Sequence, residues 1–173
     1  MKHLLDIQSI EVGDIHQILS RAKDFKDALA SGRSCEDILS GKVIINMFFE
    51  NSTRTLTSFQ MAAYRLGAQV INWQVSSSST KKGETFSDTM ECVAGYHPDA
   101  IVVRHEEFKA PYTVKKIVDC PVINAGDSWR AHPSQALLDV FTMQENLGDI
   151  AGKTIAICGD VAHSRVASSN VEI

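Results

Sequence analysis

Apolar residues in this chain alternate between short unbroken runs and stretches in which they recur every three or four positions. The clearest run is VIINMFF, residues 43–49, which is β-branched and aromatic and therefore predicts a buried strand. Beyond it, apolar residues recur at helical spacing from Leu56 to Leu66, and Gly67 ends the pattern. The pattern predicts a helix over residues 53–66, which begins at the carboxyl end of a strand.

The same alternation continues through the rest of the chain. Further strands are predicted over residues 69–73, 99–103, 121–124 and 153–158, and further helices over residues 11–30, 85–96, 110–118 and 133–147. Another helix is expected to start after the last of these strands, at the segment GDVAHSR, residues 159–165. We expect Ser9 to cap the first of these helices. The apolar residues of this first helix should form one stripe that packs on the rest of the protein: Val12, Ile15, Ile18, Leu19, Ala22, Phe25 and Leu29. Strands that alternate with helices predict an α/β fold, in which a parallel sheet carries helices on both faces through right-handed crossovers. The pattern does not predict the order of the strands.

Composition narrows the class of protein. The 173 residues are 44% hydrophobic and 22% charged, as in a soluble globular protein, and the net charge of −4 argues against a general affinity for nucleic acid. No apolar run approaches the roughly 20 residues of a membrane span, and the first residues, MKHLLDIQ, lack a signal-peptide core. We therefore expect a cytoplasmic protein without a membrane partner. Four scattered cysteines without a CxxC pair are predicted to be reduced core thiols rather than metal ligands: Cys35, Cys92, Cys120 and Cys158.

The start of the predicted helix over residues 53–66 has the composition of an anion site. A helix N-terminus presents unpaired backbone N–H groups and partial positive charge. Ser52, Thr53 and Thr55 add hydroxyl donors, and Arg54 adds a planar guanidinium that fits two phosphate oxygens. An ordinary capped helix with a surface arginine would look the same in this octapeptide, so other residues must decide between the two interpretations.

Other polar residues follow the predicted strands in the same way. Arg104 directly follows the strand over residues 99–103. His132 directly precedes the helix over residues 133–147, and Gln135 lies in the first turn of that helix. Because open parallel sheets bind ligands at the carboxyl ends of their strands, these residues should converge with Arg54. Next to two cations the pKa of His132 should be low, which would leave a neutral imidazole able to donate to a polarised carbonyl.

Two further motifs leave alternatives open. The segment SSSSTKKGET, residues 76–85, is polar and carries Lys81 and Lys82, so it is either a lid that brings a cation over a phosphate or a solvated turn. Gly159 and Asp160 follow the predicted strand over residues 153–158, but no GxGxxG pattern accompanies them. A dinucleotide-binding fold is therefore disfavoured.

Taken in order, FFENSTRT, SSSSTKKGET, VVRH, AGD with HPSQALLD, and GDVAHSR resemble the catalytic chains of the aspartate carbamoyltransferase family, from about residue 43 to the end. The resemblance implies a carbamoyl-phosphate-binding domain over residues 1–132. Residues 133–173 would be the connecting helix and an incomplete start of the aspartate-binding domain. On this reading the second domain is truncated, so we expect the chain to keep its phosphate site but to bind aspartate poorly.

The resemblance also implies an activity: transfer of the carbamoyl group of carbamoyl phosphate to the amine of L-aspartate, which gives N-carbamoyl-L-aspartate and phosphate in the committed step of de novo pyrimidine biosynthesis. No metal or cofactor is implied. The chain would form a homotrimer with shared active sites, and whether regulatory chains join it stays open. The residues implied to bind carbamoyl phosphate are Ser52, Thr53, Arg54, Thr55, Arg104, His132 and Gln135, with Ser78 and Lys82 from a neighbouring subunit. Of these, Arg54, Thr55, Arg104 and His132 are implied to be catalytic, and Arg165 and Lys82 to bind aspartate.

The chain departs from the family pattern at Leu56 and Gln60, where most relatives have arginine and glutamate. An exposed i,i+4 ion pair is worth only about 0.3–0.5 kcal/mol, so we expect no loss of chemistry. Two rival functions are ornithine carbamoyltransferase and a non-catalytic homologue that serves as an assembly partner. Ser134 and Lys82 favour the aspartate enzyme over the first, and the complete set of basic residues argues against the second.

Overall fold

The computed structural model describes residues 1–74 and 84–173, so the predicted roles of Ser78 and Lys82 concern residues outside the described part. The helices are α1 (Val12–Ala30), α2 (Thr53–Arg65), α3 (Phe86–Ala94), α4 (Ala110–Ile117), α5 (Pro133–Leu147) and α6 (Arg165–Glu172). The strands are β1 (Val43–Phe48), β2 (Gln69–Gln74), β3 (Ala100–His105) and β4 (Val122–Asp127). Each of these helices and strands overlaps a segment that the sequence pattern selected, including the helix expected after residue 160.

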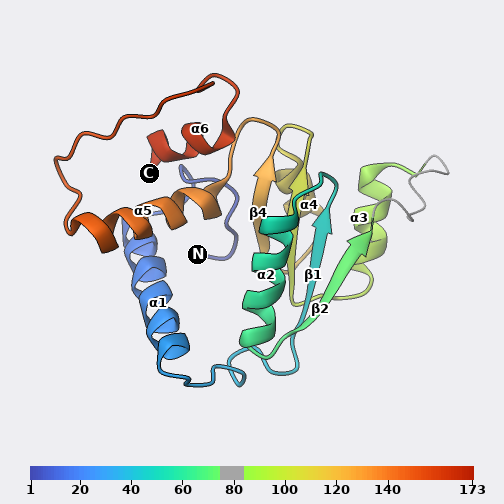
Figure 1. The fold of residues 1–173 in the computed structure, drawn as a ribbon. Helices are drawn as coiled ribbons and strands as arrows, with labels where there is room; N and C mark the ends of the chain where they lie inside the picture. Colours follow the sequence, from blue (N-terminus) through green and yellow to red (C-terminus); the bar gives the residue numbers. More distant parts are fainter. Residues whose placement is uncertain (75–83) are drawn as a thin grey trace.

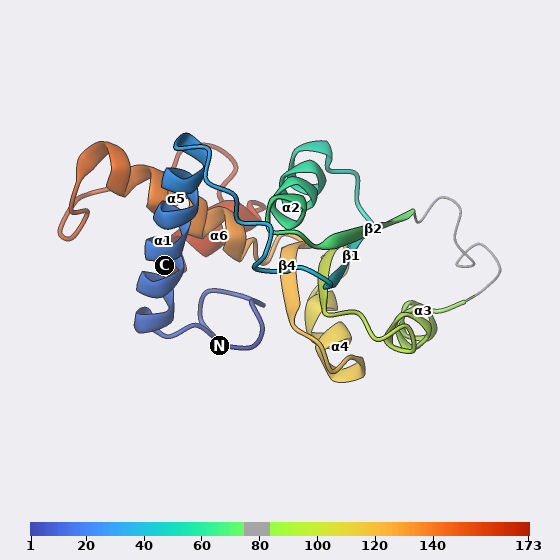
Figure 2. The same cartoon turned by 90° about the horizontal axis from the view of Figure 1, so that it is seen from below.

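The strands form a parallel sheet in the order β2-β1-β3-β4 (Figure 1). Seen from below, α2 lies on one face of this sheet and α3 and α4 lie on the other, while α1, α5 and α6 gather beside the β4 edge (Figure 2). The predicted α/β fold with helices on both faces of a parallel sheet is therefore confirmed.

The core lies where the sheet packs against α3 and α4. Parallel strands that are covered on both faces have continuous apolar sequences, and the unbroken apolar runs of this chain are of that kind. The side chains of this core are 2% exposed or less: Ile45, Met47, Met90, Val93, Ile101, Val103, Val114 and Val122. Burial of these side chains holds the sheet rigid, and a rigid sheet fixes the positions of the residues at its edge.

Local chemistry sets the ends of two helices. At the start of α3, Thr85 and Asp88 form a capping box, in which each side chain accepts a hydrogen bond from the other residue's backbone N–H. After α2 the chain turns at Gly67, whose φ is +85°. A Cβ atom there would lie 1.7 Å from the carbonyl oxygen of Glu36, so only glycine allows the loop before β1 to pack against this turn.

The prediction of a fifth strand over residues 153–158 is wrong. These residues have no regular secondary structure, and Ile155 and Ile157 are 54% and 37% exposed. A strand needs a neighbour for its backbone hydrogen bonds, and the chain here loops away from the sheet (Figure 1). The outer edge of β4 is instead met by the N-terminal segment, where the N–H of Leu4 donates to Val122 and its carbonyl accepts from Asn124.

Two further expectations about α1 need correction. Ser9 does not cap the helix, because the N-cap residue is Glu11 and the Ser9 hydroxyl donates to the carbonyl of Asp6. The predicted apolar stripe is only partly covered, since Val12 and Leu29 are 68% and 51% exposed. None of the helices in the described ranges, α1 included, is long and apolar enough to cross a membrane.

The cysteines are free, and of the four only Cys120 packs against the main core. Cys92 and Cys158 are exposed, and Cys35 and Cys120 are half-buried. Burial raises the pKa of the Cys120 thiol, which favours its neutral form. The prediction of core thiols is therefore wrong for the other three, because Cys35 and Cys158 lie in loops and Cys92 lies on an exposed face of α3.

Candidate functional site

A cavity of about 730 Å³ lies at the carboxyl edge of the sheet, between the N-terminal ends of α2, α5 and α6 and the end of β3. Seven of the residues selected from the sequence line it together: Ser52, Arg54, Thr55, Arg104, His132, Gln135 and Arg165. We call it the basic cavity. Thr53 is exposed and does not line it, although this residue begins α2. The convergence expected from the ends of parallel strands is thus observed.

The start of α2 is free to meet a ligand. Ser52 is the N-cap residue, yet its side chain makes no capping hydrogen bond, so its hydroxyl is available to the cavity. The first turn of the helix contains no acidic residue that would neutralise the helix dipole. Arg54 is exposed at this end of the helix. Backbone N–H groups, a hydroxyl and a guanidinium therefore face the same space.

Two arginines from distant parts of the chain share one carboxylate at the inner end of the cavity. Glu50 Oε2 accepts from Arg104 Nε at 3.0 Å and from Arg165 Nη2 at 2.7 Å. The side chains of Arg104 and Arg165 are 12% and 18% exposed. Burial and the nearby charge of Arg165 lower the pKa of Arg104, although Glu50 opposes this shift. Two cations and one anion leave this end of the cavity positively charged.

Gly126 in β4 makes room for both guanidinium groups. Its φ is +122°, and a Cβ atom there would lie 3.2 Å from Arg165 Nη1 and 3.3 Å from Arg104 Nη1. A side chain at this position would therefore strain the backbone and crowd the arginine pair.

His132 lies between Arg104 and α6 and is only 7% exposed. Burial, followed by the charges of Arg104 and Arg165, lowers its pKa to about 4, so its imidazole is neutral near pH 7. Its backbone N–H donates to Ser169 Oγ at 2.9 Å, and Ser134 Oγ lies 3.3 Å from Nδ1. The predicted neutral state holds, but burial contributes most to it, and the second cation is Arg165 rather than Arg54.

Several residues of the site were not selected from the sequence. Glu50 was overlooked because an acid beside an anion site has no obvious use, although it stands only two residues before Ser52. Leu138 of α5 is apolar but 54% exposed, and it lines the basic cavity. Val166, next to Arg165, also lines it, as does Ser134, which the sequence had marked only as a difference between the two carbamoyltransferases.

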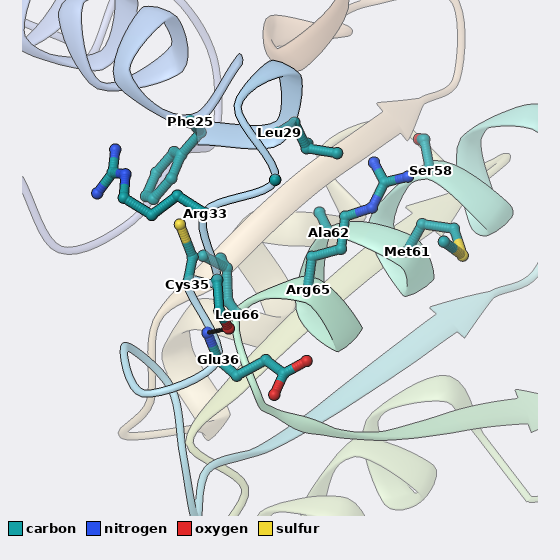
Figure 3. Close-up of a pocket in the computed structure, with 12 residues that line it drawn as sticks. Phe25, Leu29, Arg33, Cys35, Glu36, Ser58, Met61, Ala62, Arg65 and Leu66 are labelled. Atoms are coloured by element: carbon teal, nitrogen blue, oxygen red, sulfur yellow. Dashed lines mark hydrogen bonds between the residues drawn. The ribbon is translucent and has the colours of Figure 1, made fainter. Parts of the chain in front are cut away.

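A second cavity, of about 570 Å³, lies between the end of α1, the loop that follows and α2 (Figure 3). Most of its wall is apolar, from Phe25, Leu29, Met61 and Leu66. Its charged residues have both signs: Arg33, Glu36 and Arg65. It has no helix N-terminus and no cluster of cations, so the basic cavity is the stronger candidate for a phosphate site.

A parallel α/β sheet with a basic cavity at the strand ends and at a helix start defines an anion-binding α/β domain. Residues 2–145 match the model of a protein family described as aspartate/ornithine carbamoyltransferase, carbamoyl-P binding domain. The chain therefore belongs to the aspartate/ornithine carbamoyltransferase family, and the resemblance found in its motifs is confirmed.

Individual relatives agree with this assignment. The chain is 49% identical over 170 residues to the aspartate carbamoyltransferase catalytic subunit of Acidiphilium cryptum, covering 98% of the chain and 55% of that protein. It is 50% identical over 171 residues to that of Myxococcus xanthus, covering 99% and 57%. The structure of Trypanosoma cruzi aspartate transcarbamoylase in complex with carbamoyl phosphate and aspartate superposes with a TM-score of 0.94 at 34% identity, covering 99% and 53%. The chain thus spans about half the length of the curated relatives it matches.

Proposed function

We propose that this chain supplies the carbamoyl-phosphate-binding part of an aspartate carbamoyltransferase, which transfers a carbamoyl group to the amine of L-aspartate and releases N-carbamoyl-L-aspartate and phosphate. The observation that carries the proposal is the basic cavity, where Arg54, Arg104 and a neutral His132 surround the start of α2. The names of the relatives and the ligands of the Trypanosoma cruzi complex support the same substrates.

The positive charge of the basic cavity suits this reaction, because negative charge develops on the substrate during it. When the amine attacks the carbamoyl carbon, charge builds on the carbonyl oxygen and then on the departing phosphate. Thr55, Arg104 and His132 would stabilise the carbonyl oxygen, and a phosphate oxygen could take the amine proton. In acyl-transfer enzymes, loss of one preorganised donor to a developing oxyanion costs about 2.7–4 kcal/mol of activation free energy.

The other residues of the cavity are assigned to the phosphate group and to the carbamoyl nitrogen of the ligand. Ser52, Arg54 and the backbone N–H of Thr53 would hold the phosphate, and Gln135 would hold the carbamoyl nitrogen. We propose that residues 1–132 form the carbamoyl-phosphate-binding domain. Residues 133–173 would then begin the aspartate-binding part, with Arg165 as a contact for an aspartate carboxylate.

A calorimetric titration of the chain, first with carbamoyl phosphate and then with aspartate, tests this proposal. We expect carbamoyl phosphate to bind and aspartate to bind weakly, since only Arg165 and Lys82 are assigned to aspartate. Ornithine added in place of aspartate is the control for substrate class, and it should produce no heat of binding. Failure of carbamoyl phosphate to bind, or tighter binding of ornithine than of aspartate, would contradict the proposal.

We further propose a cytoplasmic homotrimer, acting in pyrimidine biosynthesis, in which Ser78 and Lys82 serve the site of a neighbouring subunit. The free cysteines agree with a reducing compartment. Arg54→Ala and Lys82→Ala chains that are each inactive should recover part of the activity of the unmodified protein when mixed, because one interface then holds an undamaged site. Mixed oligomers as inactive as their parents would place the lysine in its own chain's site.

A further inference from the structure

Gln135 is held by a carboxylate one helical turn away. Its Nε2 donates to Asp139 Oδ1 at 2.8 Å, and both residues lie on α5. The other carboxylate oxygen, Oδ2, accepts from Asn170 Nδ2 of α6, also at 2.8 Å. Two amide groups from two helices therefore occupy both oxygens of Asp139.

This contact sets the direction of the Gln135 amide. An ionised carboxylate accepts hydrogen bonds and donates none, so the group that Gln135 turns toward Asp139 must be its –NH₂. The carbonyl oxygen Oε1 then points the other way, and Gln135 lines the basic cavity. A ligand in the cavity meets a hydrogen-bond acceptor at this position.

We propose that Asp139 is a positioning residue that makes Gln135 an acceptor, so that the basic cavity selects ligands with an N–H group beside the phosphate. This inference rests on the proposed function and deepens it. A carbamoyl or amide group satisfies the oriented carbonyl oxygen. An acyl phosphate with a methyl group in that place offers this oxygen no hydrogen-bond donor, which weakens its binding.

A purely structural role for Asp139 would be to tie α5 to α6 through Asn170. The two roles are separable because one carboxylate oxygen serves each contact. Asn170→Ala removes the tie between the helices and leaves Gln135 oriented. Asp139→Ala removes both contacts and frees the Gln135 amide to turn, so these two variants form a matched pair.

The test compares three probes by calorimetry on the full chain. Phosphonoacetamide carries an amide –NH₂, 2-oxopropylphosphonate carries a methyl group in its place, and inorganic phosphate reports the phosphate subsite alone. We expect the unmodified chain and Asn170→Ala to prefer the amide by about tenfold. In Asp139→Ala this preference should fall to about threefold or less, while the affinity for inorganic phosphate is unchanged.

An undiminished preference in Asp139→Ala, or an equal loss in Asn170→Ala, would overturn the inference. If Asp139→Ala does not fold, Asp139→Asn in the Asn170→Ala background keeps the side-chain shape and can hold the Gln135 amide in either direction, so the preference should again fall. Failure of the unmodified chain to bind any of the three probes would count against the proposed function instead.

Discussion

Two arginine clusters lie at the same edge of the sheet, and they differ in their balance of charge. Around Arg130 two carboxylates face one guanidinium, whereas around Glu50 two guanidinium groups face one carboxylate. Both clusters are largely buried. From this difference we infer that the Arg130 cluster stabilises the fold and that the Glu50 cluster takes part in ligand binding.

The Arg130 cluster is complete in itself. Arg130 donates to Asp6 Oδ2 at 2.9 Å and to Asp127 Oδ2 at 2.8 Å, and Asp6 also accepts from the hydroxyl of Tyr112. Burial would raise the pKa of Asp6, but the hydrogen bonds from Tyr112, Ser9 and Arg130 outweigh it and hold the pKa below its usual value. The cluster ties the N-terminal segment to the end of β4 and to the loop that leads into the basic cavity.

The cluster around Glu50 is incomplete. Arg165 Nη1 is buried and has no hydrogen-bond partner among residues 1–74 and 84–173. Arg104 shares the single carboxylate, and Arg54 adds a third guanidinium to the lining of the cavity. Buried donors without partners are costly, so we expect a bound anion to stabilise this arrangement.

The largest effect is expected from breaking the complete cluster. Arg130→Met should lower the free energy of unfolding by about 3–5 kcal/mol, because it leaves two buried carboxylates without their cation. Chemical denaturation measures this loss. Arg21→Met is the control, since the Arg21 side chain is 71% exposed and its ion pair with Asp24 should contribute little. A loss below about 1 kcal/mol for Arg130→Met would remove the structural role.

The second prediction uses the low pKa of His132. Because its folded pKa of about 4 lies below the ordinary 6.5, the unfolded chain binds the proton more readily between these values, and stability falls as the pH drops through this window. The lost free energy of unfolding should reach about 3 kcal/mol near pH 4. Denaturation at pH 7 and pH 4 measures it. His132→Gln should lose this part of the pH dependence, whereas His16→Gln should keep it.

The smallest expected change in stability concerns the space for the arginine pair. Gly126→Ala should cost about 1–3 kcal/mol of stability through backbone strain and should also weaken phosphate binding, because the new methyl group crowds Arg104 and Arg165. Gly152→Ala is the matched control, since Gly152 also has a positive φ but nothing lies within 4 Å of its added Cβ. Equal phosphate affinity in the two variants would show that the arginines do not need this space.

The sequence predicted most of the sheet and most of the basic cavity because both depend on local patterns. Apolar runs mark buried strands, and Arg54, Arg104 and His132 stand where elements begin or end. Contacts between distant positions were not predictable in this way. The ion pair between Arg130 and Asp6 joins residues 124 positions apart, and the sequence around either residue does not indicate the other as its partner.

The error over residues 153–158 has a different cause. The segment has the composition of a strand, but composition only makes a strand possible, and a neighbouring strand must supply the hydrogen bonds. Sequence reasoning could likewise place Gln135 in the site without finding the direction of its amide, which depends on the hydrogen bond from its side chain to Asp139.

We propose above all that the phosphate of carbamoyl phosphate binds in the basic cavity. The second cavity, between α1 and α2, is the alternative site. Calorimetric titration of carbamoyl phosphate into the unmodified chain, Arg54→Ala and Arg33→Ala tests the proposal directly, because each variant removes one arginine from one cavity. We expect Arg54→Ala to weaken the binding of carbamoyl phosphate by about 10- to 100-fold without loss of stability, and Arg33→Ala to change this affinity by less than about twofold. Unchanged affinity in Arg54→Ala, or an equal loss in Arg33→Ala, would contradict the proposal.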